Sequence, residues 1–364
     1  MRAFLKTSRE LTVILTMLFL STSAFGLAYA EDEHAGAQCA EPLGAHGCKT
    51  TIQAAIDAAS PGNTIDVYPG NYTETASGRT LASIGGTYQF GLFIGLNRSG
   101  ITIRGVDTDG ERIDNYREVK AFITTNSTSD FGPSGIFVEG DGVTISGLGI
   151  GVNLHGQNKT IEVIGDDFTL SDCDISDIGG SVYINDFSFD TINNSSHLRS
   201  YRIEGNNFQD GVSIDIANGA GFSGPVKGRV IKKNKFANSN YWPSISFNGS
   251  DTGVEWFIYS VGGAVIRDNT FVNTFDSSDS LQLLKEGHIR ARGTYDNSQF
   301  DWKMYFNENK FDSAYATGPK PPKDLRTYSY TSGTYVFNNI RRIGALLAGE
   351  QAIAQPGDKI ISKH

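Results

Sequence analysis

The residues best suited to catalysis in this chain lie in one short stretch, residues 285–292. His288, Arg290 and Arg292 alternate there with apolar residues, and Lys285 precedes them. In a β-strand with its apolar residues inward, a period of two places these three basic side chains on one outer face, about 7 Å apart. Cations at that spacing suit a clamp on the carboxylates of an acidic polymer.

This basic group predicts one kind of chemistry. A lyase or C5-epimerase acting on a uronic-acid polymer needs a cation that neutralises the sugar carboxylate and a base that removes the C5 proton. Lys285, His288, Arg290 and Arg292 are the candidate catalytic residues. The alternative is an exposed strand without activity, whose charges pair with nearby carboxylates such as Glu286.

A second group of candidates is polar and aromatic. Alternation in residues 212–216 and 244–248 predicts outward-pointing hydroxyl, carboxyl and amide groups, with two aromatic residues alongside. Aromatic rings beside such groups suit sugar binding, whereas the alternative is an ordinary solvated sheet face. The candidate substrate-binding residues are Ser213, Asp215, Tyr241, Trp242, Ser246 and Asn248.

Motifs that identify a reaction are absent from the sequence. It contains no nucleophile elbow, no Walker phosphate loop and no HExxH metalloprotease motif. An inactive binding or surface-structural protein therefore stays beside the enzyme as a function class, and interaction with extracellular polysaccharide is the prediction common to both.

A degenerate repeat predicts the scaffold that holds these strands. Each copy has an apolar residue, then Asn, then Phe or Ile, and repeated units of this kind indicate a stacked fold. The copies lie at residues 202–208, 230–236, 265–271, 305–311 and 335–340. Aligning the earlier strands with them gives one inward column, namely Leu148, Cys173, Asn206, Asn234, Asn269, Asn309 and Asn339.

The members of this column have predicted structural roles. The Asn amides are expected to hydrogen-bond the backbone of the coils above and below. Cys173 is expected to be a buried, inert thiol. Cys39 and Cys48 flank a short loop and are candidates for a disulfide, with two unpaired thiols as the alternative.

The N-terminal part of the repeat region indicates a cap followed by a strand. Apolar residues at helical spacing in residues 51–59 predict a short helix, and residues 64–68 alternate as a strand. The run TIQAAIDAASPGNTIDVYPGNYTE, residues 51–74, resembles the N-terminal cap and first rung of right-handed parallel β-helix proteins of the pectin-lyase-like class. That class includes pectin methylesterases and polysaccharide lyases.

The resemblance implies an all-β, single-domain, right-handed parallel β-helix over residues 51–342, with an N-terminal cap at 51–60. It implies no activity, because the catalytic motifs of those enzymes are not found. Residues 31–50 are expected to form an irregular leader, and residues 343–364 a C-terminal cap or tail. Residues in excess of those that a three-strand coil needs are expected to project from it as loops, at residues 185–200, 218–227, 248–260 and 312–332.

Residues 1–30 are predicted to be a cleavable secretory signal. A basic start precedes the apolar run at residues 11–20, and Ala28-Tyr29-Ala30 supplies a cleavage site. The run is too short to span a membrane, and no other stretch is long enough. We expect a secreted protein, periplasmic or extracellular; the alternative is a retained N-terminal anchor.

The net charge of the chain restricts the classes of partner that it can bind. The 364 residues carry a formal net charge of −9, and cleavage removes three basic residues and one acidic residue, which gives −11. An acidic surface argues against nucleic acid and anionic membranes. It also counts against a polyanionic substrate unless basic groups are concentrated locally. No cofactor is predicted, except that Asp166, Asp167, Asp172 and Asp174 crowd one coil and form a weak candidate Ca²⁺ site.

Overall fold

The computed structural model describes residues 33–35, 49–82, 86–127, 135–154, 159–177, 180–185, 200–217, 228–237, 245–248, 264–275, 289–293, 303–307, 309–315, 325–329, 334–338 and 359–363. The chain divides into two units, residues 1–31 and 32–364, and every described residue lies in the second. Toward the C-terminus the description covers mainly the backbone of the strands.

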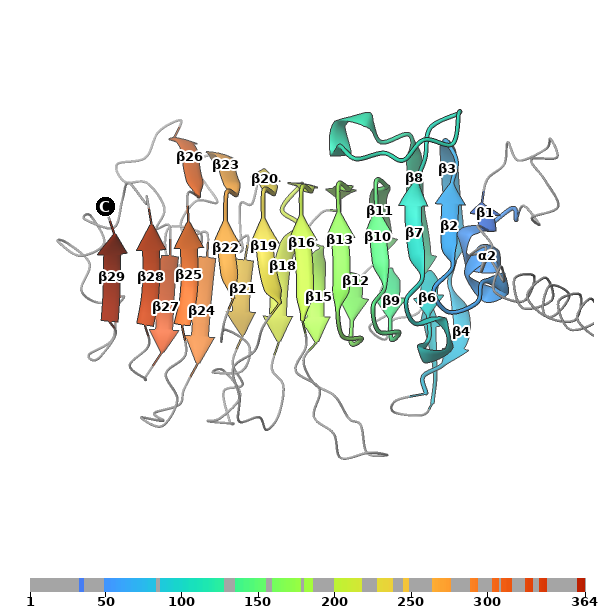
Figure 1. Cartoon of the computed structure of the whole chain (residues 1–364), viewed down its shortest axis with the longest axis horizontal. Helices are drawn as coiled ribbons and strands as arrows, with labels where there is room; N and C mark the ends of the chain where they lie inside the picture. The colour runs from blue at the N-terminus through green and yellow to red at the C-terminus, as the bar shows by residue number, and fades with distance from the viewer. Residues whose placement is uncertain are drawn as a thin grey trace, which may run out of the picture. The chain divides into compact units, whose positions relative to one another are not determined.

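Three long parallel sheets form the fold (Figure 1). Sheet A has the order β1 (Glu33–Ala35), β2 (Thr64–Val67), β7 (Thr102–Gly105), β10 (Thr144–Ser146), β13 (Phe168–Ser171), β16 (Tyr201–Glu204), β19 (Arg229–Lys232), β22 (Val265–Arg267), β25 (Lys303–Asn307), β28 (Thr334–Asn338) and β29 (Lys359–Lys363).

Sheet B has the order β3 (Gly70–Thr75), β8 (Ala121–Ser127), β11 (Gly149–Leu154), β14 (Asp174–Ser176), β17 (Asn207–Gln209), β20 (Lys235–Ala237), β23 (Thr270–Phe275) and β26 (Lys310–Tyr315). Sheet C has the order β6 (Leu92–Ile94), β9 (Ile136–Val138), β12 (Lys159–Val163), β15 (Ser181–Asn185), β18 (Ser213–Ala217), β21 (Ile245–Asn248), β24 (Ile289–Gly293) and β27 (Leu325–Ser329).

From β2 to β27, each coil of the chain contributes one strand to each sheet. The chain passes from β13 in sheet A to β14 in sheet B, then to β15 in sheet C, and returns to sheet A as β16. This is a right-handed parallel β-helix, with the handedness that parallel crossovers adopt (Figure 1). The fold class predicted from the sequence is confirmed.

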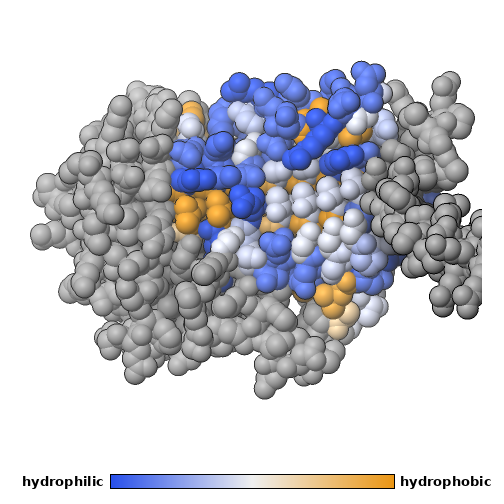
Figure 2. Space-filling view, viewed as in Figure 1, coloured by the Kyte–Doolittle hydropathy of each residue, from blue (hydrophilic) through white to orange (hydrophobic). Residues whose placement is uncertain are grey.

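The side chains inside the coils are almost all apolar. In sheet A, Ile145, Leu170, Ile203, Ile231 and Ile266 stack in register and are at most 1% exposed. Outward positions of the same sheet carry a column of half-buried threonines: Thr64, Thr102, Thr144 and Thr169. The face shown in Figure 2 accordingly has a pale region of intermediate hydropathy between hydrophilic edges.

A short helix closes the first coil. In α2 (Ile52–Ala58) the residues Ile52, Ala55 and Ile56 are buried on the core. The Thr51 hydroxyl accepts a hydrogen bond from the backbone N–H of Ala54 at 3.1 Å, as an N-cap residue does. At the other end, the Arg98 guanidinium donates to the carbonyl oxygens of Ile56 and Asp57, at 2.8 and 2.5 Å.

A buried carboxylate also holds this helix. Glu74 is 3% exposed, and its Oε1 accepts a hydrogen bond from the Ile52 backbone N–H at 2.7 Å. Burial raises the pKa of Glu74, and hydrogen bonds from the Ile52 and Gln53 backbone oppose that rise. Two 3₁₀ turns, η1 (Leu96–Arg98) and η2 (Tyr116–Glu118), and the antiparallel hairpin of β4 (Ser77–Thr80) and β5 (Thr87–Phe90) complete the described elements.

The predicted asparagine ladder is present. Asn269 Oδ1 accepts hydrogen bonds from both the backbone N–H and the side-chain amide of Asn234, each at 3.0 Å. Its Nδ2 donates to the Ile231 carbonyl and to Asn309 Oδ1, again at 3.0 Å. Asn206 continues the pattern, because its backbone and side-chain N–H groups donate to Asn234 Oδ1. These buried amides therefore tie each coil to the next.

The ladder ends at Cys173. The Cys173 backbone N–H donates to Asn206 Oδ1 at 2.9 Å, and its thiol is fully buried. Burial raises the pKa of Cys173 to about 12, which disfavours the reactive thiolate, and the predicted burial of this thiol is confirmed. Leu148 occupies the preceding position of the column and is also buried. Asn339 lies outside the described residues, as do Cys39 and Cys48.

The residue just before each ladder position turns the chain from sheet A into sheet B. Gly205, Lys233 and Asp268 all have φ between 55° and 70°, in the left-handed region. Glycine adopts this φ without strain, and a Cβ at Gly205 would lie 2.5 Å from Asp172 Oδ1, so a larger residue there would displace the Asp172 side chain. Behind the turn, the rings of Phe208, Phe236 and Phe271 stack with centroids 4.8 and 5.0 Å apart.

Two segments differ from the sequence-based expectations. Residues 31–50, expected to be an irregular leader, contain β1, which pairs with β2. Residues 312–332, expected to be a loop, contain the end of β26 and all of β27, because this coil continues the register of sheets B and C. Residues 186–199, 218–227 and 249–263, which hold most of the other predicted loops, lie outside the described residues. No helix in the described part of the chain is long and apolar enough to span a membrane.

The ladder makes a stability prediction. Asn269→Ala removes the acceptor of the Asn234 N–H and a donor to the Ile231 carbonyl, which leaves buried backbone groups unsatisfied. We expect a loss of about 2–4 kcal/mol in the free energy of unfolding, measured by urea denaturation. Asn71→Ala, at an exposed Asn of sheet B, is the control and should change it by less than about 0.5 kcal/mol. Equal losses of unfolding free energy in both variants would show that the ladder asparagine contributes no more stability than an exposed one.

Candidate functional site

The outer face of sheet C brings polar residues from successive coils into one column. Strand pairing in register places side chains of equivalent position on top of one another, about 4.8 Å apart. The column, here called the C column, consists of Phe93, Phe137, Glu162, Tyr183, Asp215, Ser246, Arg290 and Arg326. In β12, β15 and β18 the flanking positions are buried aliphatic residues, such as Ile214 and Ile216 beside Asp215.

The N-terminal end of the C column is covered. The β4–β5 hairpin places Phe90 on the outer face of sheet C, where its ring stacks on Phe137 and Phe93 with centroids 4.5 and 5.6 Å apart. Leu81 joins this cluster and is 4% exposed. The hydrophilic part of the column therefore begins at Glu162.

A lysine, a carboxylate and a phenol form the first polar group. Lys159 Nζ lies 2.7 Å from Glu162 Oε1 and 4.2 Å from the centroid of the Tyr183 ring. Burial, followed by the negative charges of Glu162 and Asp215, raises the pKa of Tyr183 to about 12. The Tyr183 phenol therefore keeps its proton at neutral pH and can donate a hydrogen bond.

The next coil supplies the predicted Ser213 and Asp215. Ser213 Oγ lies 3.2 Å from Asp215 Oδ2, so the two side chains form one hydrogen-bonded unit. Ser213 shares the outward face with Asp215, as alternation predicts, but it is only 6% exposed. Its role is to orient Asp215, which is half-buried, at the surface.

A carboxyl group with a shifted pKa lies at the edge of this face. The Thr160 hydroxyl donates to Asp177 Oδ2 at 2.9 Å, and burial raises the pKa of Asp177 to about 6. Gly180 makes room for the pair, because a Cβ there would lie 2.3 Å from Asp177 Oδ2 and 2.2 Å from Thr160 Oγ1. A group that titrates near neutral pH suits proton transfer.

The structure joins the two groups of sequence-predicted candidates. Strand β24 pairs with β21, so that Arg290 stands opposite Ser246 and Arg292 opposite Asn248. Ser246 in turn stands opposite Asp215. The candidate catalytic strand and the candidate substrate-binding strands are therefore neighbours in one sheet. The side chains of these four β21 and β24 residues, and all of Tyr241, Trp242, Lys285 and His288, lie outside the described part of the structure.

Sequence reasoning missed Lys159, Glu162, Tyr183 and Asp177. The alternation of residues 161–163 was a usable signal, because it places Glu162 outward between two buried residues. Stacking Glu162 on Tyr183 required the register, and β12 is irregular between Lys159 and Ile161. The sequence alone does not reveal such a bulge.

The aspartates considered for Ca²⁺ have other partners. Asp174 Oδ1 accepts hydrogen bonds from Asn207 Nδ2 and Gln209 Nε2, at 2.7 and 2.6 Å. Asp166 Oδ1 accepts bonds from the Ser200 backbone and hydroxyl, and Asp172 lies 3.7 Å from Arg112. Among the described residues, no group of three or more His, Cys, Asp or Glu is placed to hold a metal ion.

Some solved structures of other proteins resemble the structure of this chain distantly. No protein-family model matches, and no curated protein sequence matches. A pectin methylesterase from carrot is 12% identical, with 91% of this chain and 76% of that chain covered and a TM-score of 0.37. A pectin methylesterase from Aspergillus niger is 15% identical, with 90% and 98% covered and a TM-score of 0.38.

An alginate lyase from Paenibacillus sp. str. FPU-7 is 16% identical, with 77% of this chain and 95% of that chain covered and a TM-score of 0.31. Similarity at this level establishes no activity for this chain. Its fold follows from the strand pairing described above.

Asp177 gives a pH prediction. Its pKa is raised from 3.8 to about 6, so the folded protein binds this proton more tightly than the unfolded chain does. The resulting stabilisation is complete below pH 3.8 and is lost as pH rises through about 6. Asp177→Asn should therefore remove a fall in thermal unfolding midpoint between pH 4 and 7. Asp109→Asn, at an exposed carboxyl, should keep the fall; a fall that persists unchanged in Asp177→Asn contradicts the assignment.

Proposed function

We propose that this protein is a secreted β-helix that binds an extended extracellular polysaccharide along the outer face of sheet C. The observation that carries the proposal is the register of the C column, which aligns Glu162, Tyr183 and Asp215 with Ser246 and Arg290. Polar and aromatic groups repeat there once per coil, which suits a polymer of repeated hydroxylated units. The predicted signal at residues 1–30 is consistent with an extracellular ligand.

The chemistry of the column divides it into two parts. Asp215 supplies a carboxylate acceptor for sugar hydroxyls, and the Tyr183 phenol, beside the ion pair of Glu162 with Lys159, supplies a donor. Arg290 and Arg326 follow in the adjoining coils, and guanidinium groups bind carboxylates in a bidentate manner. A polymer that carries some uronic-acid units would place its carboxylates at the arginines and its hydroxyls at the acidic part.

A second candidate function is lyase or C5-epimerase activity on the same polymer. The observation that favours it is Asp177, a carboxyl group with a pKa of about 6 at the edge of the same face. In β-elimination, a base takes the C5 proton, a double bond forms between C4 and C5, and the C4–O bond breaks with protonation of the leaving oxygen. Lys285, His288, Arg290 and Arg292 remain the proposed residues for neutralising the sugar carboxylate.

Binding distinguishes the proposed site from the rest of the surface. We expect Arg290→Ala to weaken binding of polygalacturonate or alginate about tenfold or more, because a charge-assisted hydrogen bond contributes roughly 1.5–3 kcal/mol. Binding of neutral dextran should not change. Thr102→Ala, on the outer face of sheet A, is the control. Isothermal titration calorimetry gives the affinities, and undiminished polyuronate binding by Arg290→Ala excludes the arginine part of the site.

The catalytic candidate has its own readout. A panel of uronic-acid polymers is incubated with the mature protein. Ultraviolet absorbance then detects unsaturated products, and NMR of the recovered polymer detects epimerised units. Activity that is lost in Arg290→Ala and Arg292→Ala would establish the enzyme. Binding without either product would leave the binding module as the function.

A further inference from the structure

The outer face of sheet B carries a second aligned column, on a different side of each coil from the C column. Strand pairing stacks Phe122, Gly149, Asp174, Asn207 and Lys235 in consecutive coils. We call these five residues the B column. From Phe122 to Lys235 there are four steps of about 4.8 Å, roughly 19 Å in all, which is long enough for several linked sugar units.

Phe122 forms an exposed aromatic surface at one end. It is 45% exposed, although it belongs to a regular strand whose inward residues Ala121 and Ile123 are 1% exposed. Its ring lies over Gly149, since a Cβ there would be 2.2 Å from Phe122 Cδ1. The missing side chain at Gly149 therefore lets the ring lie against the sheet and leaves ring surface open to solvent. Such aromatic surfaces pack on the apolar faces of pyranose rings.

Asp174 provides a fixed acceptor beside this ring. Its Oδ1 accepts hydrogen bonds from Asn207 Nδ2 and Gln209 Nε2, which hold the carboxylate in place. In the part of the chain that the structure describes, Oδ2 has no hydrogen-bond donor. An oriented carboxylate oxygen next to an aromatic surface is the arrangement that a sugar hydroxyl requires.

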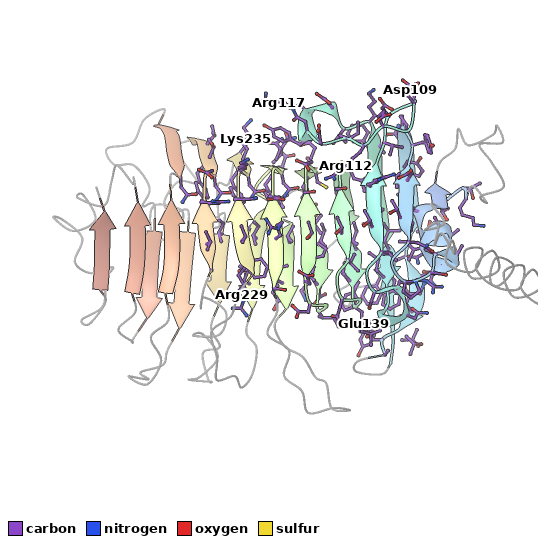
Figure 3. All side chains as sticks on the ribbon, in the orientation of Figure 1. Asp109, Arg112, Arg117, Glu139, Arg229 and Lys235 are labelled. Atoms are coloured by element: carbon purple, nitrogen blue, oxygen red, sulfur yellow. The ribbon has the colours of Figure 1, made fainter. Side chains whose placement is uncertain are left out.

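The other end of the column is basic. Lys235 belongs to the column, and Lys233 is exposed in the turn just before it. Neither lysine pairs with a carboxylate among the described residues. Figure 3 shows Lys235 on the upper side of the view. In a chain of net charge −9, basic groups without carboxylate partners mark a local site for an anion.

We propose that the B column is a second polysaccharide-binding surface, which binds chains with uronic-acid units more tightly than neutral chains. Phe122 packs against one pyranose ring, Asp174 accepts a hydroxyl hydrogen bond, and Lys235 and Lys233 bind a carboxylate farther along the chain. This surface is independent of the C column, because its residues lie in sheet B and share no side chain with sheet C. The two surfaces would let one molecule hold two polymer chains, or two segments of one chain.

The experiment measures binding in an Arg290→Ala background, in which the C column is weakened. Alginate oligosaccharides and neutral dextran oligosaccharides are titrated by calorimetry. We expect Phe122→Ala to reduce the affinity for both ligands about fivefold or more. Lys235→Ala should reduce the affinity for alginate alone and make it less dependent on salt concentration. Leu96→Ala, at an apolar residue that is also 45% exposed, is the matched control and should have no effect.

A second variant tests the position of the ring without removing it. Gly149→Ala places a Cβ where the Phe122 ring lies, so it should reduce binding to the level of Phe122→Ala while circular dichroism shows a folded protein. Normal binding by Phe122→Ala, Lys235→Ala and Gly149→Ala would overturn the B-column proposal and leave the C column intact. Loss of all alginate binding in Arg290→Ala alone would also overturn it, because the two surfaces would then not be independent.

Discussion

The structure depends on the hydrogen bonding of a buried amide column. Asn206, Asn234 and Asn269 are at most 1% exposed, and each must satisfy both an amide oxygen and an amide nitrogen inside the coil. Each amide oxygen accepts a hydrogen bond only when the preceding coil places its backbone N–H at the same height. A slip of one residue would bury unpaired polar groups and turn every outward side chain inward. The ladder therefore selects one register for the whole of the later coils.

That register gives the outer faces their chemical order. Because successive coils are held in step, an outward residue in one strand always meets the equivalent residue of the next. Glu162, Tyr183 and Asp215 thereby form one group, although they are 21 and 32 residues apart in the chain. The apolar start of the inward column, Leu148 and Cys173, shows that early coils keep the same register by packing alone. Glycine, aspartate or lysine in the left-handed turn before the column serves both regions.

The sequence predicted the parts of the fold that depend on local pattern. The recurring sequence of an apolar residue, then Asn, then Phe identified the ladder. Such a pattern is expected to recur once per coil only where these side chains point into the coil. The sequence did not predict which outward residues meet across coils, because this depends on loop length and on the bulge in β12. The pKa of Asp177 was equally hidden, since its cause is burial beside Thr160 and Gly180. The adjacency of Ser246 and Arg290 required the pairing of β21 with β24, across a long intervening segment.

Net charge is a poor guide to the ligand of such a scaffold. The value of −9 counts against a polyanion when charges are averaged over the surface, but ions screen charges beyond about 10 Å at ordinary ionic strength. A polymer lying on one face is therefore influenced mainly by the column beneath it and by its immediate neighbours. In both columns a carboxylate part adjoins a basic part: Glu162 and Asp215 precede Arg290 on sheet C, and Asp174 precedes Lys235 on sheet B. For the polysaccharide proposed above, the carboxylate part of each column would accept hydrogen bonds from hydroxyl groups, and the basic part would bind carboxylates. A uronic-acid unit carries both kinds of group, so the local charges of each column, and not the net charge of the protein, decide whether such a polymer fits.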